Sequence, residues 1–262
     1  MKNVVITGSS RGLGLCMAKE FLKAGCRVTV SGRSEKSLEK AKKELAEYKE
    51  RVFFMPCNVR NIEEIEQLWQ ESVKRWGHID HWINNAGQNT PHVFIYETGK
   101  EYVDAVIDTN IKGIIFGCQV AAKNMLAQGG GQIWNMEGLG SDDMIQPKTI
   151  LYGTSKRALT YFTRALAKEL EGTPVLAGRL SPGMMLTDFI TLTPEGESSP
   201  VLEDPHFQKI FNILGDKPED VAAFLVPRIL ANTKQDAKIA WLTPTKVMLR
   251  FATSPFKKRK LI

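Results

Sequence analysis

Residues 4–25 read VVITGSSRGLGLCMAKEFLKAG, and this stretch decides the fold class. The apolar run at its start predicts a buried strand, and the pattern at its end predicts an amphipathic helix. Between them lie Gly8, Gly12 and Gly14. Small residues let the backbone approach a pyrophosphate, and the first turn of a helix offers it unpaired N–H groups. The stretch therefore predicts a dinucleotide-binding turn, in preference to a turn that is merely tight.

The rest of the chain repeats this alternation of strand and helix. Runs rich in Val and Ile predict strands at residues 3–7, 27–31, 52–57, 81–84, 131–135 and 175–180, with a seventh candidate near 238–242. Ser34 is the expected N-cap of a surface helix whose Leu38, Ala41 and Leu45 face inward. We predict an α/β fold. It is one doubly wound domain over residues 1–262, a parallel sheet of six to seven strands with helices on both faces.

Composition excludes several classes of protein. The 262 residues are 43% hydrophobic, enough to bury one full core, and no apolar run approaches the ~20 residues that cross a bilayer. The start, MKNVVITGSS, enters the first strand at once, so no targeting peptide is expected in this chain. Four widely spaced cysteines and no clustered histidines predict neither disulfides nor a metal site, and indicate a reducing compartment. The net charge of +6 is modest, and no nucleic-acid partner is expected.

Much of the positive charge lies in the ending FKKRKLI, where four consecutive cations adjoin Phe256, Leu261 and Ile262. This basic C-terminal tail, residues 244–262, has two interpretations. It contacts a membrane surface or a partner, or it is a solvated, frayed end of the chain.

The end of the second predicted strand carries another cofactor signal. Dinucleotide-binding folds place an acid there for a ribose 2′-OH, or a cation for a 2′-phosphate. This chain reads VSGRS, with Arg33 and no acid, and Arg11 in the Gly-rich turn offers a second cation. NADP(H) is therefore favoured over NAD(H). The alternative is that both arginines are solvated surface residues.

Tyr152 and Lys156 are the candidate proton-transfer pair. They are four residues apart in the helical stretch YGTSKRALTYFTRALAKEL, so both project from one face of one turn. A nearby ammonium stabilises tyrosinate and is expected to lower the phenol pKa from ~10. YxxxK occurs by chance when taken alone. Here it accompanies the Gly-rich turn, NNAG at residues 84–87, DTNIKG around Asn110 and SPGMMLT at residues 181–187.

Together these motifs resemble the short-chain dehydrogenase/reductase family over nearly the whole chain. The resemblance implies a Rossmann domain that binds NAD(P) and transfers hydride at a carbonyl or carbinol carbon. It implies that Tyr152 donates a proton to the carbonyl oxygen, that Lys156 holds the nicotinamide ribose, and that Asn110 holds a water. Asn58 replaces an Asp that many members carry beside the adenine, and an amide still hydrogen-bonds the base. The implied cofactor-binding residues are Gly8, Ser10, Arg11, Gly12, Leu13, Gly14, Arg33, Asn58, Val59, Asn85, Ala86, Gly87, Lys156, Pro182, Gly183 and Thr187.

One residue of the family pattern is missing. Members usually carry a Ser about thirteen residues before the Tyr, and here that position is Leu139. We predict that Ser141 supplies the hydroxyl that orients the substrate oxygen. The alternative is that Ser141 caps a turn with Asp142, and that a backbone N–H or nothing replaces the hydroxyl. Loss of one preorganised donor of this kind raises a barrier by ~2.7–4 kcal/mol.

Within this family the chain resembles the chlorophyll(ide) b reductases. The matching stretches are NMEGLGS before YGTSK, FLVPRIL and the ending AWLTPTKVMLRFATSPFKKRK. The resemblance implies NADPH-dependent reduction of the 7-formyl group of chlorophyll(ide) b to a 7-hydroxymethyl group. It also implies a homo-oligomer in the cytoplasm or plastid stroma, peripheral at photosynthetic membranes. Glu137 is either a marker that lines the site or a carboxylate that bonds the loop. The alternatives are a reductase of another ketone or aldehyde, and a catalytically quiet NADP-binding scaffold or sensor.

Residues 184–215 are the expected substrate loop. Three prolines and weak periodicity predict a long loop with short helical pieces, and such loops are often lids. Its apolar residues either form the wide mouth that a flat tetrapyrrole needs, or belong to the core or an oligomer interface. They are Met184, Met185, Leu186, Phe189, Ile190, Leu192, Phe207, Ile210 and Phe211.

Overall fold

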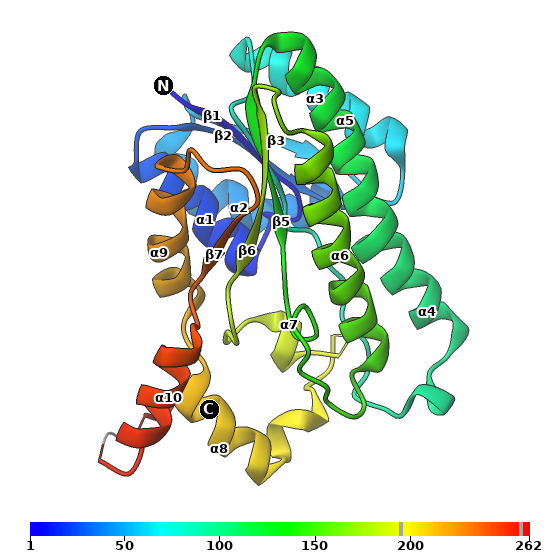
Figure 1. The fold of residues 1–262 in the computed structure, drawn as a ribbon, viewed down its shortest axis with the longest axis vertical. Helices are drawn as coiled ribbons and strands as arrows, with labels where there is room; N and C mark the ends of the chain where they lie inside the picture. Colours follow the sequence, from blue (N-terminus) through cyan, green and yellow to red (C-terminus); the bar gives the residue numbers. More distant parts are fainter. Residues whose placement is uncertain (194–195, 257–258) are drawn as a thin grey trace.

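The computed structural model describes residues 1–193, 196–256 and 259–262, with a parallel sheet at its centre (Figure 1). Within these residues seven strands follow the order β3-β2-β1-β4-β5-β6-β7, and each neighbouring pair is parallel. The six predicted strands and the seventh candidate are confirmed, with ends shifted by at most two residues. Their bounds are β1 (Asn3–Ile6), β2 (Arg27–Gly32), β3 (Val52–Pro56), β4 (His81–Asn84), β5 (Gly131–Met136), β6 (Val175–Ser181) and β7 (Ala237–Ala240).

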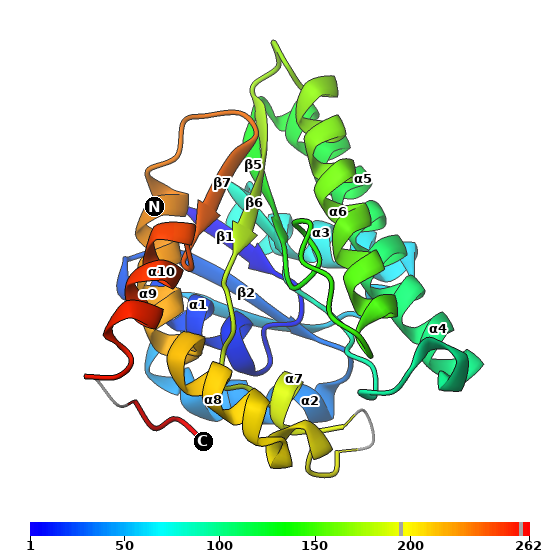
Figure 2. The same cartoon turned by 60° about the horizontal axis from the view of Figure 1, so that its bottom comes forward.

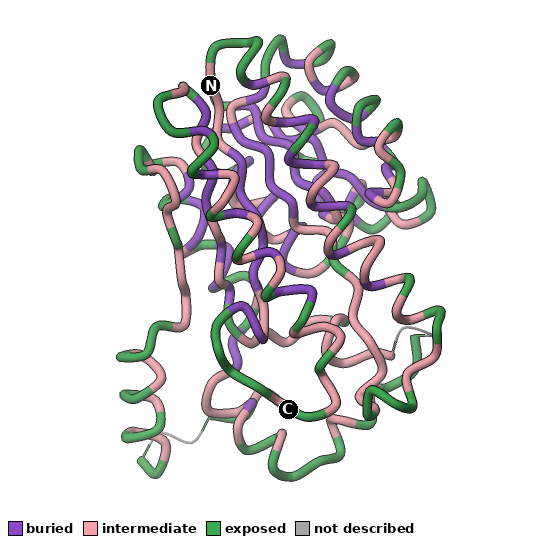
Figure 3. The backbone as a smooth tube through the Cα atoms, turned by 45° about the vertical axis from the view of Figure 1, so that its right-hand side comes forward, coloured by how far each residue is buried: buried purple, intermediate pink, exposed green. Residues whose placement is uncertain are grey.

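Helices cover both faces of the sheet, as predicted (Figures 1 and 2). One apolar core joins the sheet to α1 and α9, and a second joins it to α3, α5 and α6. In Figure 3 the strands form the buried interior and the helices carry the exposed residues. The helix bounds are α1 (Gly12–Lys23), α2 (Glu35–Glu44), α3 (Ile62–Trp76), α4 (Lys100–Val106), α5 (Gly113–Gln128), α6 (Ile150–Glu169), α7 (Asp188–Thr191), α8 (Pro205–Leu214), α9 (Pro218–Leu230) and α10 (Pro244–Thr253), with short 3₁₀ segments η1 (Ala46–Tyr48), η2 (Ile95–Glu97) and η4 (Pro200–Glu203).

The strand order reverses between β1 and β4, which makes this edge of the sheet a binding crevice. The chain moves outward from β1 through β2 to β3, then returns to pair β4 with the other side of β1. In open α/β sheets, ligands bind outside the carboxyl ends of the strands at such a reversal. The Gly-rich turn follows β1 and therefore lies at this point.

Helix α2 shows that local signals in the sequence were sufficient to place a surface helix. Ser34 is its N-cap, and the Ser34 hydroxyl accepts a hydrogen bond from the backbone N–H of Ser37 at 3.3 Å. A cap of this kind contributes about 1 kcal/mol. Leu38, Ala41 and Leu45 are fully buried, as the spacing predicted.

Residues 184–215 contain α7, η4 and α8, which confirms the prediction of short helical pieces in a long loop. Residues 194 and 195 of this loop lie outside the described residues. Helix α8 begins with Pro205, and the Asp204 side chain accepts from the backbone N–H of His206 at 2.8 Å. In Figure 2, α7 and α8 lie beyond the carboxyl ends of the strands, next to the crevice.

The C-terminal region differs from the predicted tail. Its first part is the helix α10, and its last residues pack against α8, where the Asn212 side chain accepts from the backbone N–H of Leu261 at 2.6 Å. Asp216 binds Arg250 of α10 at 2.7 and 2.9 Å, Arg259 at 2.9 Å, and the Trp241 indole at 2.6 Å. The frayed-end interpretation is therefore wrong for residues 259–262, while Lys257 and Lys258 lie outside the described residues. No described helix is long and apolar enough to cross a membrane.

Candidate functional site

The Gly-rich turn is shaped by close backbone approaches that only glycine allows. A side chain on Gly8 would lie 2.6 Å from the Ala86 backbone, and Gly8 has a φ of 62°, a region that favours glycine. The Asn85 amide donates to the carbonyls of Thr7 and Gly8 at 3.0 and 2.9 Å and so fixes the turn to the end of β4. Gly12 lines the cavity at the first turn of α1, and the nearest atom to an added carbon there would be a Thr187 methyl at 3.8 Å, an ordinary contact. This cradle fits a pyrophosphate.

One cavity of about 1740 Å³ runs from this turn to Tyr152 and Lys156. It is lined by every residue that the sequence assigned to cofactor binding. Of the four residues assigned to catalysis, Tyr152 and Lys156 line it, and Asn110 and Ser141 do not. The cavity therefore brings together residues from β1 to α6 that are far apart in the sequence.

Arg33 and Arg11 occupy different positions in this cavity. Arg33 is exposed at the end of β2, beside Ser37 and Lys40 of α2 on the cavity wall. Arg11 forms an ion pair of 3.3 Å with Asp188 of α7, and both side chains are largely exposed. Among the described residues no ion pair involves Arg33, while Arg11 connects the Gly-rich turn to the substrate loop.

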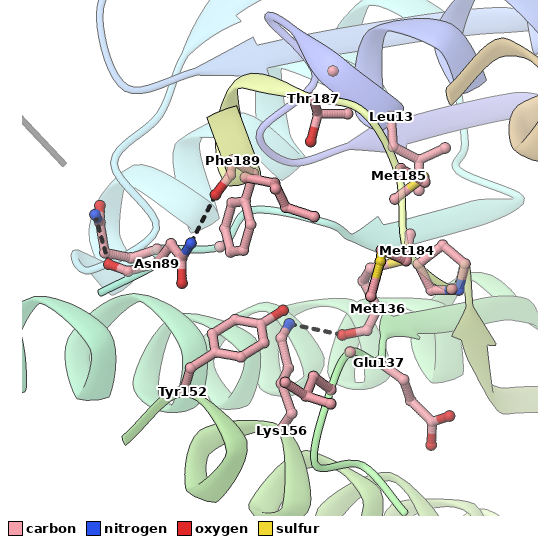
Figure 4. A pocket seen from close by; sticks show the side chains of 18 of the residues that line it. Leu13, Asn89, Met136, Glu137, Tyr152, Lys156, Met184, Met185, Thr187 and Phe189 are labelled. Carbon is pink, nitrogen blue, oxygen red and sulfur yellow. Dashed lines mark hydrogen bonds between the residues drawn. The ribbon is translucent and has the colours of Figure 1, made fainter. Parts of the chain in front are cut away.

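Tyr152 and Lys156 lie side by side on the first turns of α6 (Figure 4). The Lys156 Nζ donates to the Met136 carbonyl at 2.9 Å and lies 5.6 Å from the centre of the Tyr152 ring. Burial lowers the pKa of Lys156 to about 8, and the charge of Glu137 opposes that shift. A backbone carbonyl at the end of β5 therefore aims the ammonium at the cavity.

The phenol differs from the prediction. Burial raises the pKa of Tyr152 above its ordinary value, so the prediction that the neighbouring cation lowers this pKa is wrong for this structure. The phenol is accordingly held in its protonated form. That is the form that can donate a proton to a carbonyl oxygen.

Asn110 is fully buried in a π-helical segment, η3 (Ile107–Lys112), between α4 and α5. Its amide accepts from the Gln88 backbone N–H at 2.7 Å and donates to the Gln88 carbonyl at 3.0 Å and to the Ser155 hydroxyl at 3.1 Å. π-Helical insertions often mark functional sites. Asn110 thus joins the loop after β4 to α6 beneath Tyr152, and its role in holding a water stays a prediction.

Ser141 holds the loop through Gly138 and Lys156, and not through the predicted turn with Asp142. Its hydroxyl accepts from the Gly138 backbone N–H at 3.0 Å and lies 3.4 Å from the Lys156 carbonyl, so it closes the loop after β5. The residue next to the phenol is Gly138, where an added side-chain carbon would overlap the Tyr152 hydroxyl and lie 3.3 Å from Cγ of Lys156. The Ser141 hydroxyl therefore belongs to the loop after β5 and not to the wall of the cavity that Tyr152 lines.

The outer part of the cavity is apolar. Across from Tyr152 lies Phe189 of α7, with ring centres 5.5 Å apart, and Asn89 donates to the Phe189 carbonyl at 2.7 Å (Figure 4). Of the nine apolar loop residues singled out, six line the cavity and three do not; the three are Leu186, Ile210 and the fully buried Phe211.

Sequence reasoning missed several parts of the cavity wall. Among them are the segment 88–93, residues of the loop before α6, and four residues of α10, Pro244, Val247, Met248 and Phe251. The amphipathic pattern of residues 244–253 was the signal that could have found the helix. No described group of acidic, His and Cys side chains is arranged to hold a metal ion.

A cradle for a pyrophosphate and a Tyr–Lys pair in one cavity, at the carboxyl edge of a doubly wound sheet, define a dinucleotide-binding oxidoreductase. The family model for short chain dehydrogenases matches residues 2–197. The chain belongs to this family.

Among curated proteins, the chain is 35% identical to the probable chlorophyll(ide) b reductase NYC1 of Arabidopsis thaliana, over 97% of this chain and 53% of that protein. It is 35% identical to the chlorophyll(ide) b reductase NOL of Arabidopsis thaliana (98% of this chain, 76% of that protein) and 37% identical to NOL of Oryza sativa subsp. japonica (95% and 73%). All three are described as chloroplastic. The chain thus spans about half the length of the NYC1 relative.

Two solved structures show the same fold. One is the closed form of serine dehydrogenase complexed with NADP+, with a TM-score of 0.79 and 25% identity over 93% of this chain and 95% of that chain. The other is ElxO with NADP bound, with a TM-score of 0.77 and 27% identity over 91% and 94%.

Proposed function

We propose that this protein is an NADPH-dependent reductase of the formyl group of chlorophyll b or chlorophyllide b. The observation that carries the proposal is the single cavity, which joins the dinucleotide cradle, the Tyr152–Lys156 pair and a wide apolar mouth. The names of the relatives that cover nearly the whole chain support the choice of substrate.

Three features support NADP(H) as the cofactor. Arg33 lies at the cavity wall at the end of β2, and no acid accompanies it in VSGRS. A guanidinium forks onto a phosphate with two hydrogen bonds, which a 2′-OH does not match. The two solved relatives above carry NADP. When bound, the cofactor supplies the hydride.

The chain's own residues supply the proton and the alignment. A formyl oxygen gains negative charge as hydride reaches its carbon, and the protonated Tyr152 phenol can donate its proton to this oxygen. Lys156, held by the Met136 carbonyl, places a positive charge beside the phenol. An opposite charge favours the tyrosinate that is left after proton transfer, although in the protein without substrate the effect of burial on the phenol pKa is the larger one. Gly138, which has no side chain, leaves room for the Tyr152 hydroxyl at this position.

The shape of the mouth supports a large, flat, apolar substrate. Met184, Met185 and Phe189 line one side of the cavity, and Met248 and Phe251 of α10 line another. Methionine side chains adapt to irregular surfaces, and ligand cavities are mainly apolar with a few polar groups. A tetrapyrrole ring fits this description.

A peripheral position at a photosynthetic membrane, in a plastid, is part of the proposal. On α10, Met248 and Leu249 are 73% and 63% exposed, and Phe256 beyond it is 88% exposed. Lys246 of α10 and the exposed Lys260 are cations of the same region. Exposed apolar residues beside cations suit the surface of an anionic bilayer. The relatives described as chloroplastic support this location.

A substrate assay tests the proposal. Purified protein is mixed with NADPH and detergent-solubilised chlorophyllide b, and loss of the formyl group is followed by absorbance and product analysis. We expect turnover, and we expect Tyr152→Phe to lower it by roughly 10²–10⁴-fold with NADPH affinity retained. Turnover of small aldehydes or ketones without turnover of chlorophyllide b would show a reductase of another carbonyl. Tyr152→Phe with an unchanged rate would show that the pair does no proton transfer.

A further inference from the structure

Helix α10 is held in place by polar contacts and buries no apolar side of its own. None of its ten residues is buried by the part of the chain that the structure describes, although Val247, Met248 and Phe251 are apolar. Its anchor is Arg250, which binds the buried carboxylate of Asp216. Helices in globular proteins are normally stabilised by an apolar side that packs against a partner. Among the described residues, the apolar side of α10 has no such partner.

The apolar residues of α10 point in two directions. Val247, Met248 and Phe251 line the cavity, and Leu249 does not. At 3.6 residues per turn, positions 247, 248 and 251 fall on one side of the helix and position 249 on the other. Met248 and Leu249 are 73% and 63% exposed, so the two sides are similarly open but face different surroundings. We call the side formed by Val247, Met248 and Phe251 the α10 wall.

The α10 wall continues the cavity from the end of β6 to the surface. Gly183 follows β6 and lines the cavity, and a carbon added to it would lie 3.0 Å from Cβ of Leu242. Leu242, Thr243 and Pro244 line the cavity in turn and lead into α10. Figure 1 shows α10 beyond the carboxyl ends of the strands, where it contacts α8. A substituent of a substrate bound at Tyr152 can therefore reach the α10 wall without leaving the cavity.

The two cations of α10 are engaged by other groups of the protein. Lys246 lies over the indole of Trp241, with its Nζ 3.0 Å from the ring centre, and Arg250 binds Asp216 at 2.7 and 2.9 Å. An acidic group on the substrate would thus meet no free cation on this helix. A hydrocarbon chain, in contrast, gains free energy when it leaves water for an apolar wall. The α10 wall therefore fits a neutral, apolar chain better than a carboxylate.

We propose that the α10 wall binds the long hydrocarbon tail of an esterified pigment. It thereby makes chlorophyll b, the ester of a long-chain alcohol, a better substrate than chlorophyllide b, which is the free acid. Each methylene group that is fully removed from water strengthens binding roughly fourfold. The wall acts on substrate affinity and not on proton transfer, because Tyr152 and Lys156 lie on α6. The inference rests on the proposed function and narrows the substrate class of the same site.

The test compares two neutral esters of the same ring. Chlorophyll b and the methyl ester of chlorophyllide b are each presented with NADPH in the same detergent micelles, and KM and kcat are measured for both. In the double variant Met248→Gln/Phe251→Gln, we expect the KM for chlorophyll b to rise at least about tenfold more than the KM for the methyl ester. The kcat for chlorophyll b should stay within a few-fold of the wild-type value. If the double variant does not fold, Met248→Gln alone gives the same comparison at a largely exposed position.

Leu249→Gln is the matched control. It places the same polar side chain on α10, on the side that does not line the cavity, and we expect the KM values for both esters to stay unchanged. An equal rise of the chlorophyll b KM in Leu249→Gln would show that α10 contacts the micelle or a membrane surface in place of the tail. That result would overturn the inference. Unchanged KM values in the double variant, or an equal rise for both esters, would overturn it as well.

The remaining outcomes separate this inference from the proposed function. A change in the sedimentation of the double variant would assign the α10 wall to a second copy of this chain and overturn the inference. Turnover of both esters with equal responses to the substitutions would remove the inference and leave the proposed function standing. No turnover of either ester by the wild-type protein would remove the proposed function, and the inference with it.

Discussion

The Tyr152 hydroxyl occupies the space into which a side chain on Gly138 would extend. An added carbon at position 138 would overlap this hydroxyl and lie 3.2 Å from the Tyr152 Cζ atom. The glycine is therefore a requirement for the position of the phenol. The position of a proton donor matters because a misplacement of about 1 Å can lower a rate by 10²-fold.

Gly138→Ala is expected to fold and to lose at least about tenfold in kcat, because the methyl group displaces the hydroxyl while the ring tilts to accommodate it. Steady-state kinetics and thermal unfolding measure the two effects. Gly153→Ala is the matched control, since its added carbon would meet Gly140 at 3.8 Å and the Leu139 carbonyl at 3.9 Å, which are ordinary contacts. Equal kinetics in Gly138→Ala and the wild type would contradict the conclusion that the phenol requires a glycine at position 138.

Ser141→Ala is expected to lower stability and to leave hydride transfer within a few-fold of the wild type. The Ser141 hydroxyl holds the Gly138 backbone N–H at 3.0 Å, and a buried donor left without its partner costs about 1–3 kcal/mol. Chemical denaturation and single-turnover kinetics report these separately. A rate loss of 10²–10³-fold with normal stability would restore Ser141 to the role of an oxyanion donor.

Arg33→Gln is expected to lower the preference for NADPH over NADH by roughly 10–100-fold, since hydrogen bonds to a charged group contribute about 1.5–3 kcal/mol. Fluorescence titration with each nucleotide gives the ratio. Lys36→Gln is the control, an exposed cation on α2 that does not line the cavity. An unchanged ratio of the NADPH and NADH affinities would show that other cations bind the 2′-phosphate.

Asp216→Asn is expected to release the C-terminal segment. This buried carboxylate binds Arg250 and Arg259, and breaking a buried pair costs about 3–5 kcal/mol. Hydrogen exchange of α10 and limited proteolysis measure the release, and the KM for a large substrate should rise because α10 lines the mouth. Asp143→Asn, at a 94% exposed carboxylate, should change neither property.

The ion pairs of Asp216 with Arg250 and Arg259 also predict that acid releases the C-terminal segment. Burial alone would raise the pKa of Asp216, but hydrogen bonds from Arg250 and Trp241 lower it below its ordinary value. The stabilisation is therefore present above the unfolded pKa of ~3.9 and is lost as the pH falls through the folded value. Protection of α10 against hydrogen exchange should fall in this acid range. Protection that declines first at neutral pH would contradict this role of Asp216.

The sequence by itself determined the parts that depend on local geometry. Alternating strands and helices, the Gly-rich turn after β1 and the N-cap Ser34 follow from periodicity and from a few adjacent residues. The same holds for Tyr152 and Lys156, because a spacing of four on a helix places both side chains on one face. Arg33 could be assigned to the cavity because, in this fold, the end of the second strand lies beside the Gly-rich turn.

The tertiary structure decided what depends on contacts between distant segments. It closed the loop after β5 with Ser141 and left Gly138 beneath the phenol. It brought Lys238 of β7 to Glu137. It also folded the basic C-terminus back onto Asn212 and Asp216. These contacts depend on strand order, loop path and burial, and neither hydrophobic periodicity nor residue spacing encodes which polar partner a buried side chain meets.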